Sequence, residues 1–449
     1  MAIPRYLNPK TPYTGASLPH RGKHPDLFFD MILMAVGLLL LVLVILLKSH
    51  TATDFNADPL ILFYTVFVTT FELSRILAAL FYRSTHKEMM KTSIANEAYE
   101  PTASFIIPCK NEAGTINKTI EKCFAADYPP EKLEVIIIND GSTDNTLEVL
   151  REVQKQYPSL VVVDWKDNRG KRHGMAEGMK LAKGEIMVQL DSDSYIEPKS
   201  FRKLIEPFRN PEIGAVCAHA DPENADENIL TKMQAAYYFL SFRILKAAES
   251  TFLSVFCCSG CSSAYRKSIV YPIIDTWLNE KFLGLPVTWG DDRALTNWVL
   301  KQGYRAIYTD EAQAYTICPS RWRIFFKQQV RWKKGWFVNS LNAAKFIWKT
   351  EPFVAFSYFF PLIAITLITP FMAVRALVYN PIVKETTPLS YMLGVYLIAA
   401  LMVVCYRYFS RSNKYWPYIF VWSTINMVFL SFILFYAMAT IQNRKWGTR

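Results

Sequence analysis

Long apolar runs lie near both ends of the chain, and a finer alternation of apolar and polar positions fills the middle. The runs cover residues 31–47, 59–82, 352–374, 386–406 and 415–443. Apolar runs of this length are typical of transmembrane helices. A charged linker at 83–100 separates the second run from the middle of the chain. The pattern therefore predicts membrane helices on both sides of a domain of another kind.

In that middle region, short β-branched runs alternate with helix-like stretches. The predicted strands are 104–108, 133–139, 160–164 and 185–190, and the predicted helices are 116–126, 144–154 and 172–182. Strands that alternate with helices indicate a parallel sheet covered by helices, in which ligands bind beyond the carboxyl ends of the strands. We expect an α/β domain with its binding site at that edge.

Two further segments, 230–248 and 321–349, mix aromatic residues with Lys and Arg at helical spacing. Such segments are typical of amphipathic helices on a membrane surface, and core-facing helices of the α/β domain are the alternative. The expected organisation is a tail with two transmembrane helices (1–82), the α/β domain (83–320), amphipathic interface helices (321–349), and C-terminal transmembrane helices with a basic tail (350–449).

The number of membrane crossings is left open by the sequence. Five crossings around an internal domain would put the C-terminus on the opposite side from that domain. The basic tail residues Arg444, Lys445 and Arg449, and the loop at 407–414, favour the inner side. Pro361 and Pro370 offer an alternative to five crossings, because they can break the first C-terminal run into a re-entrant pair.

Polar residues also occur inside the second apolar run. Glu72 and Arg75 are three residues apart and share a helical face. They form either a mutual ion pair or part of a polar path that lines a channel.

Composition narrows the class of partner. Hydrophobic residues make up 51% of the chain and the net charge is +11, with basic residues mostly flanking the apolar runs. This distribution fits the cytoplasmic face of a membrane and anionic substrates, and no RNA-binding or zinc-finger motif favours nucleic acid. The first thirty residues lack a secretory cleavage site. Cys257, Cys258 and Cys261 cluster without a second pair to complete a zinc site, so we expect reduced thiols.

Two acidic residues follow the apolar run that ends at Leu190. Asp191 and Asp193 therefore emerge where a buried strand ends. Two carboxylates one residue apart suit Mg²⁺ or Mn²⁺, which would bridge the two phosphates of a nucleotide-sugar and neutralise the leaving diphosphate. We expect Asp191 to lie beside the nucleotide as well.

Other strand ends and turns carry candidate nucleotide contacts. Asp140 ends an apolar strand and is placed to accept a hydrogen bond from a uracil ring. Lys171 and Arg172 follow Gly170 in a basic turn that suits the base or the diphosphate. A solvated charge cluster is the alternative for this turn.

An adjacent acidic pair, Asp291 and Asp292, lies between Gly290 and Arg293. Neighbouring carboxylates repel, which raises the pKa of one of them, and a base that takes a proton from a sugar hydroxyl benefits from a raised pKa. We interpret Asp292 as the base and Asp291 as its orienting neighbour. A helix N-cap role is compatible with this reading.

A basic and aromatic element lies further along the chain. Gln328 and Arg331 share a helical face, and Arg331 suits a phosphate of the donor. Trp332 offers a flat ring on which an acceptor sugar can stack. A place in the aromatic belt of a membrane interface is the alternative for Trp332.

Together these motifs resemble a known family, the processive membrane-bound inverting β-glycosyltransferases that include hyaluronan, chitin and cellulose synthases. Hyaluronan synthases are the most similar members. The residues that carry the resemblance are Gly170-Lys171-Arg172-His173, Phe282-Leu283-Gly284-Leu285-Pro286, Gly290-Asp291-Asp292-Arg293, Gln328-Gln329-Val330-Arg331-Trp332 and Trp446-Gly447-Thr448-Arg449.

The resemblance implies a GT-A type nucleotide-sugar domain joined to a multi-pass helical membrane domain, with a cytoplasmic tail. It implies the following sites: Asp140 and Lys171 at the nucleotide, Asp191 and Asp193 at the metal, Asp292 as base, and Trp332 and the segment with Cys261 beside the acceptor. On their residue chemistry we also place Arg172, Gln328 and Arg331 at the nucleotide-sugar.

The expected function is polysaccharide synthesis from UDP-sugars with Mg²⁺ or Mn²⁺, in the plasma membrane with the catalytic domain in the cytoplasm. The growing chain and membrane lipids are the other partners, and no protein partner is required. Hyaluronan, from UDP-N-acetylglucosamine and UDP-glucuronate, is favoured over chitin, poly-N-acetylglucosamine or another β-glucan or capsule polymer. Transferases that add one sugar to a lipid generally lack the Gln328/Arg331/Trp332 element, and the intact acidic set argues against a transporter or scaffold.

Overall fold

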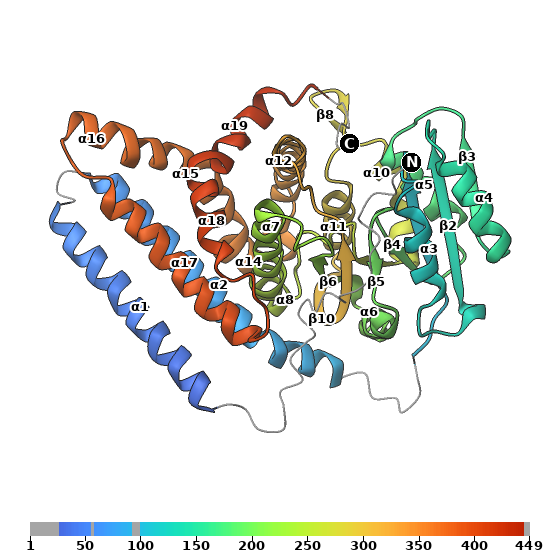
Figure 1. Cartoon of the computed structure of the whole chain (residues 1–449), viewed down its shortest axis with the longest axis horizontal. Coiled ribbons are helices and arrows are strands. Elements are labelled where there is room, and N and C mark those ends of the chain that lie inside the picture. The colour runs from blue at the N-terminus through green and yellow to red at the C-terminus, as the bar shows by residue number, and fades with distance from the viewer. Residues whose placement is uncertain (1–26, 55–57, 92–98, 444–449) are drawn as a thin grey trace.

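The computed structural model describes residues 27–54, 58–91 and 99–443. Expectations for the N-terminal tail and for Trp446–Arg449 lie outside these residues. The α/β domain occupies one side of the molecule and the long apolar helices occupy the other, with α7, α8 and α12 between them (Figure 1).

A sheet of eight strands forms the centre of the α/β domain, in the order β3-β2-β1-β4-β7-β6-β10-β5. The strands are β1 Ala103–Cys109, β2 Leu133–Asp140, β3 Val161–Trp165, β4 Ile186–Gln189, β5 Tyr195–Ile196, β6 Ile213–Pro222, β7 Ser263–Arg266 and β10 Arg305–Thr316. The first four confirm the predicted strands and pair in parallel. β7 runs antiparallel to both β4 and β6, so it joins two parallel halves. A separate hairpin pairs β8 Lys281–Phe282 with β9 Leu285–Pro286.

Amphipathic helices cover this sheet because their apolar positions recur at helical spacing. The predicted helices appear as α3 Ile116–Phe124, α4 Thr146–Gln156 and α5 Lys171–Leu181. Ile116, Ile120, Met175 and Met179 are fully buried against the sheet. The remaining helices of the domain are α6 Phe201–Ile205, α9 Lys267–Val270, α10 Ile274–Leu278 and α11 Asp291–Lys301.

The two amphipathic segments form helices between the sheet and the apolar helices. The first comprises α7 Ile229–Leu240, a π-helical turn at Ser241–Lys246, and α8 Ala247–Thr251. Phe239 of α7 is buried against Tyr406, with ring centroids 4.0 Å apart. The second segment is one long helix, α12 Trp322–Ala344, followed by the short α13 Ile347–Thr350.

The apolar runs are helical over most of their length. They comprise α1 Leu27–Asp54, α2 Pro59–Lys91, α14 Pro352–Val354, α15 Phe360–Val374, α16 Asn380–Val383, α17 Leu389–Phe409, α18 Tyr418–Ile425 and α19 Ser431–Ala439. Within the described residues, four helical runs are long and apolar enough to cross a membrane, at 59–86, 352–383, 389–409 and 418–439, and the apolar part of α1, Met31–Leu47, is shorter.

The run at 352–383 is not broken into a re-entrant pair. It continues through Pro361 and Pro370, with π-helical turns at Ala355–Phe359 and Arg375–Tyr379. Pro361 lies just after the π-helical turn at Ala355–Phe359, and this wider turn accommodates a residue without a backbone N–H inside the helix.

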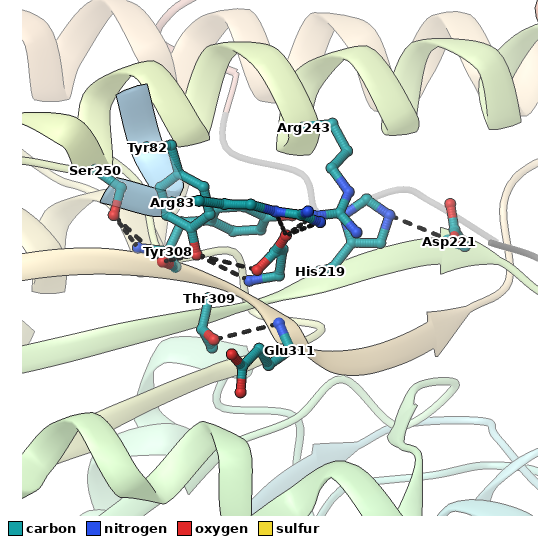
Figure 2. Close-up of polar contacts among 10 residues, drawn as sticks. Tyr82, Arg83, His219, Asp221, Arg243, Ser250, Tyr308, Thr309 and Glu311 are labelled. Atoms are coloured by element: carbon teal, nitrogen blue, oxygen red, sulfur yellow. Dashed lines mark hydrogen bonds and ion pairs between the residues drawn. The ribbon is translucent and has the colours of Figure 1, made fainter. Parts of the chain in front are cut away.

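Ion pairs attach the ends of these helices to the sheet. Arg83, near the end of α2, and Arg243, in the π-helical turn, both pair with Asp310 of β10 (Figure 2). Arg305 pairs with Glu351, just before α14. These contacts place the end of α2 and the start of the 352–383 run beside the α/β domain.

The last apolar run both begins and ends beside the α/β domain. Lys414, just before α18, pairs with Asp226 at 2.8 Å. After α19, the Lys334 ammonium of α12 donates hydrogen bonds to the carbonyl oxygens of Thr440 and Asn443, at 2.6 and 2.9 Å. The run stays helical from α18 through a π-helical turn at Asn426–Leu430 into α19, which packs against α12.

Candidate active site

The predicted site residues meet at one large cavity along the carboxyl ends of the parallel strands. Its volume is about 2220 Å³. The walls include the site residues Asp140, Lys171, Asp191, Asp193, Cys261, Asp291, Asp292, Gln328, Arg331 and Trp332, which come from positions far apart in the sequence. Arg172 is the one predicted site residue that does not line this cavity.

Asp140, the last residue of β2, organises the loop that follows β3. Its carboxylate accepts hydrogen bonds from the backbone N–H groups of Arg169 and Gly170, at 2.6 and 2.9 Å. A Cβ on the next residue, Gly141, would lie 2.7 Å from the backbone nitrogen of Asn168, so only glycine permits this approach. A carboxylate has about four acceptor positions, so Asp140 keeps capacity for a ligand while it holds the loop.

Lys171 and Arg172 point in different directions because they are successive residues of α5. Lys171 forms an ion pair with Asp191 inside the cavity. Although burial lowers it, the pKa of Lys171 is raised overall by the Asp191 carboxylate, so the ammonium stays charged. Arg172 is buried and donates to Glu280, at 2.6 Å, and to the carbonyl oxygen of Val287, at 2.9 Å.

Asp191 and Asp193 form a small acidic group at the end of β4. The Ser194 hydroxyl donates to Asp193 at 3.1 Å, and both carboxylates line the cavity. The described residues contain no cluster of three or more His, Cys, Asp or Glu that could hold a metal ion by itself. Two carboxylates nevertheless fit a Mg²⁺ or Mn²⁺ ion that takes its other ligands from substrate phosphates and water.

The loop that carries the cysteines bridges Asp191 and Asp292. A Cβ on Gly260 would lie 3.2 Å from Asp191 Oδ1, and the Gly260 N–H donates to Asp292 Oδ2 at 3.3 Å. The Cys257 thiol also donates to Asp292 Oδ2, at 3.5 Å. The two acidic motifs are about a hundred residues apart in the sequence, and both lie beside Gly260.

The eight cysteines are all free. Cys261 is nearly buried and lines the cavity next to Gly260. Burial, followed by the negative charge of Asp292, raises the pKa of Cys257 to about 12. This thiol is therefore neutral near pH 7 and serves as a hydrogen-bond donor.

Asp291 and Asp292 begin α11 but occupy different environments. Asp291 is buried, and its carboxylate lies 3.7 Å from the Arg172 guanidinium. Burial raises the pKa of Asp291 to about 6, against the lowering effect of Arg172 and Lys171. Asp292 is half-buried and faces the cavity. The pKa elevation that we expected for the base therefore falls on the orienting neighbour, because Asp291 is the carboxylate removed from water.

Helix α12 brings the basic and aromatic element to the opposite wall. The Gln328 amide oxygen is buried without a hydrogen-bond partner in the described structure, and Trp332 is 36% exposed within the cavity wall. The pKa of Arg331 is lowered overall, because the effect of burial outweighs the charges of Asp191, Asp291 and neighbouring acids, which raise it. These side chains face the same space as the acidic groups.

Sequence reasoning missed several residues that shape the site. Gly260 was not singled out, and neither was Glu280, which binds Arg172 and accepts a hydrogen bond from Trp298 Nε1 at 2.6 Å. Lys246 and Lys333 also line the cavity. The only local signal for these two cations was their place in the predicted amphipathic segments.

Comparison with known proteins agrees with this geometry. Residues 104–273 match the family model described as glycosyl transferase family 2. A hyaluronan synthase of Streptococcus pyogenes serotype M1 is 30% identical over 355 residues, which covers 77% of this chain and 82% of the synthase. An N-acetylglucosaminyltransferase of Rhizobium meliloti is 26% identical over 402 residues, covering 88% of this chain and 92% of that protein.

Among solved structures, a mannosyltransferase from Pyrobaculum calidifontis, in complex with GDP-mannose and Mn²⁺, aligns with a TM-score of 0.59. It is 21% identical, and the alignment covers 85% of this chain and 99% of the mannosyltransferase. This likeness confirms the α/β fold that the strand and helix pattern predicted and the GT-A type that the family resemblance implied. The chain is a glycosyltransferase of family 2 and belongs with the membrane-bound transferases that include hyaluronan synthase.

Proposed function

We propose that this protein builds a linear β-linked polysaccharide from UDP-sugars and passes the product into its own membrane region. The observation that carries the proposal is the continuous cavity. It joins the acidic groups at the sheet edge to Ile365 and Thr366 of α15 and to Trp422 and Asn426 in the last apolar run. A transferase that adds a single sugar to a soluble acceptor has no need for a path between apolar helices.

The donor would lie along the sheet edge, with the uracil ring near Asp140 and the diphosphate near Lys171 and Arg331. Cationic side chains in a water-poor cavity stabilise the charge that develops on a leaving nucleoside diphosphate. The buried, unpartnered Gln328 amide oxygen supplies a further polar contact on the same side. Arg172 is assigned a different role from the one expected, because its partners Glu280 and Asp291 make it a positioning residue for the start of α11.

Asp193 and Asp191 would hold the divalent cation together with the donor phosphates. When bound, this cation neutralises charge on the diphosphate. The Lys171–Asp191 ion pair places a protein cation at the same carboxylate, so Asp193 is the better candidate for a direct ligand.

Asp292 would act as the base in a single displacement. The acceptor hydroxyl attacks the anomeric carbon of the donor, its proton passes to the Asp292 carboxylate, and the bond between that carbon and the UDP oxygen breaks. One oxygen of Asp292 is oriented by the Arg293 N–H, at 2.8 Å, and the other by Gly260 and Cys257. A positioned carboxylate base of this kind contributes about 10²- to 10⁴-fold to the rate.

The acceptor end of the polymer would rest against Trp332, close to the cysteine loop. Aromatic rings suit the apolar faces of sugars. Beyond the base, Trp422 lines the cavity and stacks on Tyr237, with ring centroids 3.8 Å apart, which extends the aromatic wall toward the apolar helices. Polar residues such as Glu72 and Thr369 line the same route.

Hyaluronan, made from UDP-N-acetylglucosamine and UDP-glucuronate, is the product that we favour. The likeness to a streptococcal hyaluronan synthase supports this choice. A polymer of N-acetylglucosamine alone is the second candidate, supported by the likeness to rhizobial N-acetylglucosaminyltransferases at 26% and 27% identity.

The protein is a membrane protein, and we place the catalytic domain in the cytoplasm at the plasma membrane. UDP-sugars are cytoplasmic donors, and the basic loop at 407–414 lies next to the catalytic domain through the Lys414–Asp226 pair. If the continuous helix at 418–439 does not cross the membrane and keeps both of its ends beside the catalytic domain, four crossings remain, and the basic C-terminal tail lies on the same side as the catalytic domain. This arrangement removes the conflict between five crossings and the basic tail.

The test is synthesis by the purified protein in vesicles with Mg²⁺ or Mn²⁺. High-mass polymer that forms only when both UDP-N-acetylglucosamine and UDP-glucuronate are present, and that hyaluronan-specific hydrolase digests, is the expected result. Polymer from UDP-N-acetylglucosamine alone would show that the product is the second candidate, a polymer of N-acetylglucosamine, and not hyaluronan. Asp292→Asn should abolish elongation while UDP still binds, and near-normal turnover in this variant would contradict the role of the base.

A further inference from the structure

Three cationic side chains line the cavity beside and beyond the base Asp292. They are Arg293 of α11, Lys333 of α12, and Lys246 of the π-helical turn. None of the three belongs to the donor side, where Lys171 and Arg331 lie. A mechanism that only neutralises a diphosphate has no use for a second group of cations at this place.

Two of these cations lack an anionic partner. The side chains of Arg293 and Lys333 make no hydrogen bond or ion pair with any part of the chain that the structure describes. Lys246, by contrast, donates to the carbonyl oxygen of Cys257. Burial, and then repulsion from Arg293, lowers the pKa of Lys333 to about 8. Although burial lowers it, the pKa of Arg293 is raised overall by nearby acidic groups that include Glu249 and Asp292, so Arg293 stays charged. A charged Arg293 beside Lys333 in a partly buried wall destabilises the charged form of Lys333, and a bound anion would relieve this repulsion.

The acids Asp292 and Glu249 raise the pKa of Arg293, but in the described part of the chain neither forms an ion pair with Arg293 or Lys333. Asp292 accepts hydrogen bonds from Gly260 and Cys257 and faces the reaction site. Glu249 accepts hydrogen bonds from the Tyr358 hydroxyl and from the Phe256 N–H. The remaining acid, Glu72, lies in α2 and lines the cavity without an ion pair to either cation.

We propose that Arg293 and Lys333 bind the carboxylate of a uronic acid residue in the polymer, close to the acceptor end that reacts at Asp292. The inference rests on the proposed function and deepens it, because it makes the chain select an acidic polysaccharide. Guanidinium and ammonium groups form charge-assisted hydrogen bonds with a carboxylate, and a neutral polymer offers no group of this kind. The contact would hold the polymer in register each time an acidic sugar passes the base.

The test compares binding of two classes of oligosaccharide to the full-length protein in detergent. Hyaluronan oligosaccharides carry a carboxylate on every second sugar, and chitin oligosaccharides of equal length carry none. The wild-type protein should bind the acidic class more tightly. Lys333→Gln should weaken binding of the acidic class by about ten- to a hundredfold, the range for a hydrogen bond to a charged group, and leave the neutral class unchanged.

Two further variants separate recognition from folding. Lys333→Arg keeps the charge and should keep the preference for acidic oligosaccharides. Lys327→Gln removes an exposed cation from the same helix and should change neither class. UDP binding, measured in parallel, should be the same in every variant.

Equal losses for acidic and neutral oligosaccharides in Lys333→Gln, or no loss for either, would overturn the inference. If the wild-type protein still makes hyaluronan in that case, only the role of the two cations is wrong. If the wild-type protein makes a neutral polymer from one UDP-sugar, the proposed product itself is wrong.

Discussion

Asp291 and Asp292 are adjacent in the sequence but occupy different environments, because Asp291 is buried and Asp292 is half-buried at the cavity wall. The pKa of Asp291 is raised to about 6 by burial, above its ordinary value of 3.8. A carboxylate with a raised pKa takes up a proton in the folded protein at a pH where the unfolded chain does not. The folded state therefore loses stability as the pH rises through about 6, and ionised Asp291 is a cost at neutral pH.

Asp291→Asn should consequently raise the melting temperature in detergent at pH 7.5. The advantage over the wild-type protein should shrink toward pH 5 and disappear near pH 4, because the wild-type carboxyl is then protonated. The pKa difference sets an upper limit of about 3 kcal/mol at neutral pH. A variant that is less stable than the wild-type protein at every pH would show that the Arg172–Asp291 contact outweighs the burial cost.

Several site residues were predictable from local sequence because they end parallel strands. Asp140 and Asp191 follow apolar runs, and the carboxyl ends of neighbouring parallel strands share one edge. Arg172 was placed at the nucleotide because it follows Lys171. Its true direction, toward Glu280 and away from the cavity, depends on the rotation between successive helical residues and on a partner distant in sequence.

Helices α11 and α12 meet through two glycines, and this contact fixes the acidic pair relative to the basic and aromatic wall. Gly290 has a positive φ of 68° just before α11. A Cβ on Gly335 of α12 would lie 2.9 Å from the Cα and the nitrogen of Gly290. The two backbones therefore touch where Asp291 begins α11.

Gly335→Ala should separate the two helices and reduce both transfer and thermal stability. A methyl group forced into a packed contact costs about 1–3 kcal/mol, and a small displacement of Asp292 lowers the rate further. Melting temperature and initial rate of polymer synthesis are the measurements. Gly394→Ala in α17 is the matched control, since its Cβ meets only Leu47 at 3.9 Å. Equal behaviour of the two variants would contradict the importance of this contact.

Elements with regular periodicity were predictable, and those formed by long-range pairing were not. The strands β1 to β4 and the helices α3 to α5 follow apolar patterns that are visible in the sequence. β6 is rich in Ala and β7 has only four residues, so neither carries a distinctive pattern. β7 lies in the sheet because β4 and β6 pair with it from both sides.

At the scale of the whole molecule, the contacts at the ends of the apolar helices predict the membrane topology. Four helix ends contact the catalytic domain or α12. They are marked by Arg83, Glu351, Lys414 and Thr440, whose carbonyl oxygen accepts from Lys334 of α12. At the opposite end of the helices, Asp58 and Arg375 form an ion pair. The sequence could not resolve this topology, since hydropathy identifies apolar runs and does not distinguish a crossing from a return.

An epitope tag placed after Arg449 should therefore be inaccessible to antibody in intact cells, and accessible after permeabilisation. A tag inserted between Thr386 and Thr387, in the loop before α17, should be accessible in intact cells. Accessibility of the C-terminal tag from outside would show that the last apolar run crosses the membrane. Activity of each tagged protein controls for correct folding.

We expect acidic groups from separate parts of the chain to surround one metal-bound nucleotide diphosphate in the cavity. The most direct measurement is a crystal structure with UDP and Mn²⁺, in which anomalous scattering locates the metal. We expect Mn²⁺ at Asp193 and Asp191, the diphosphate beside Lys171 and Arg331, and Asp292 facing the sugar side of the diphosphate. Mn²⁺ bound away from these carboxylates, or a diphosphate remote from Asp292, would contradict the account.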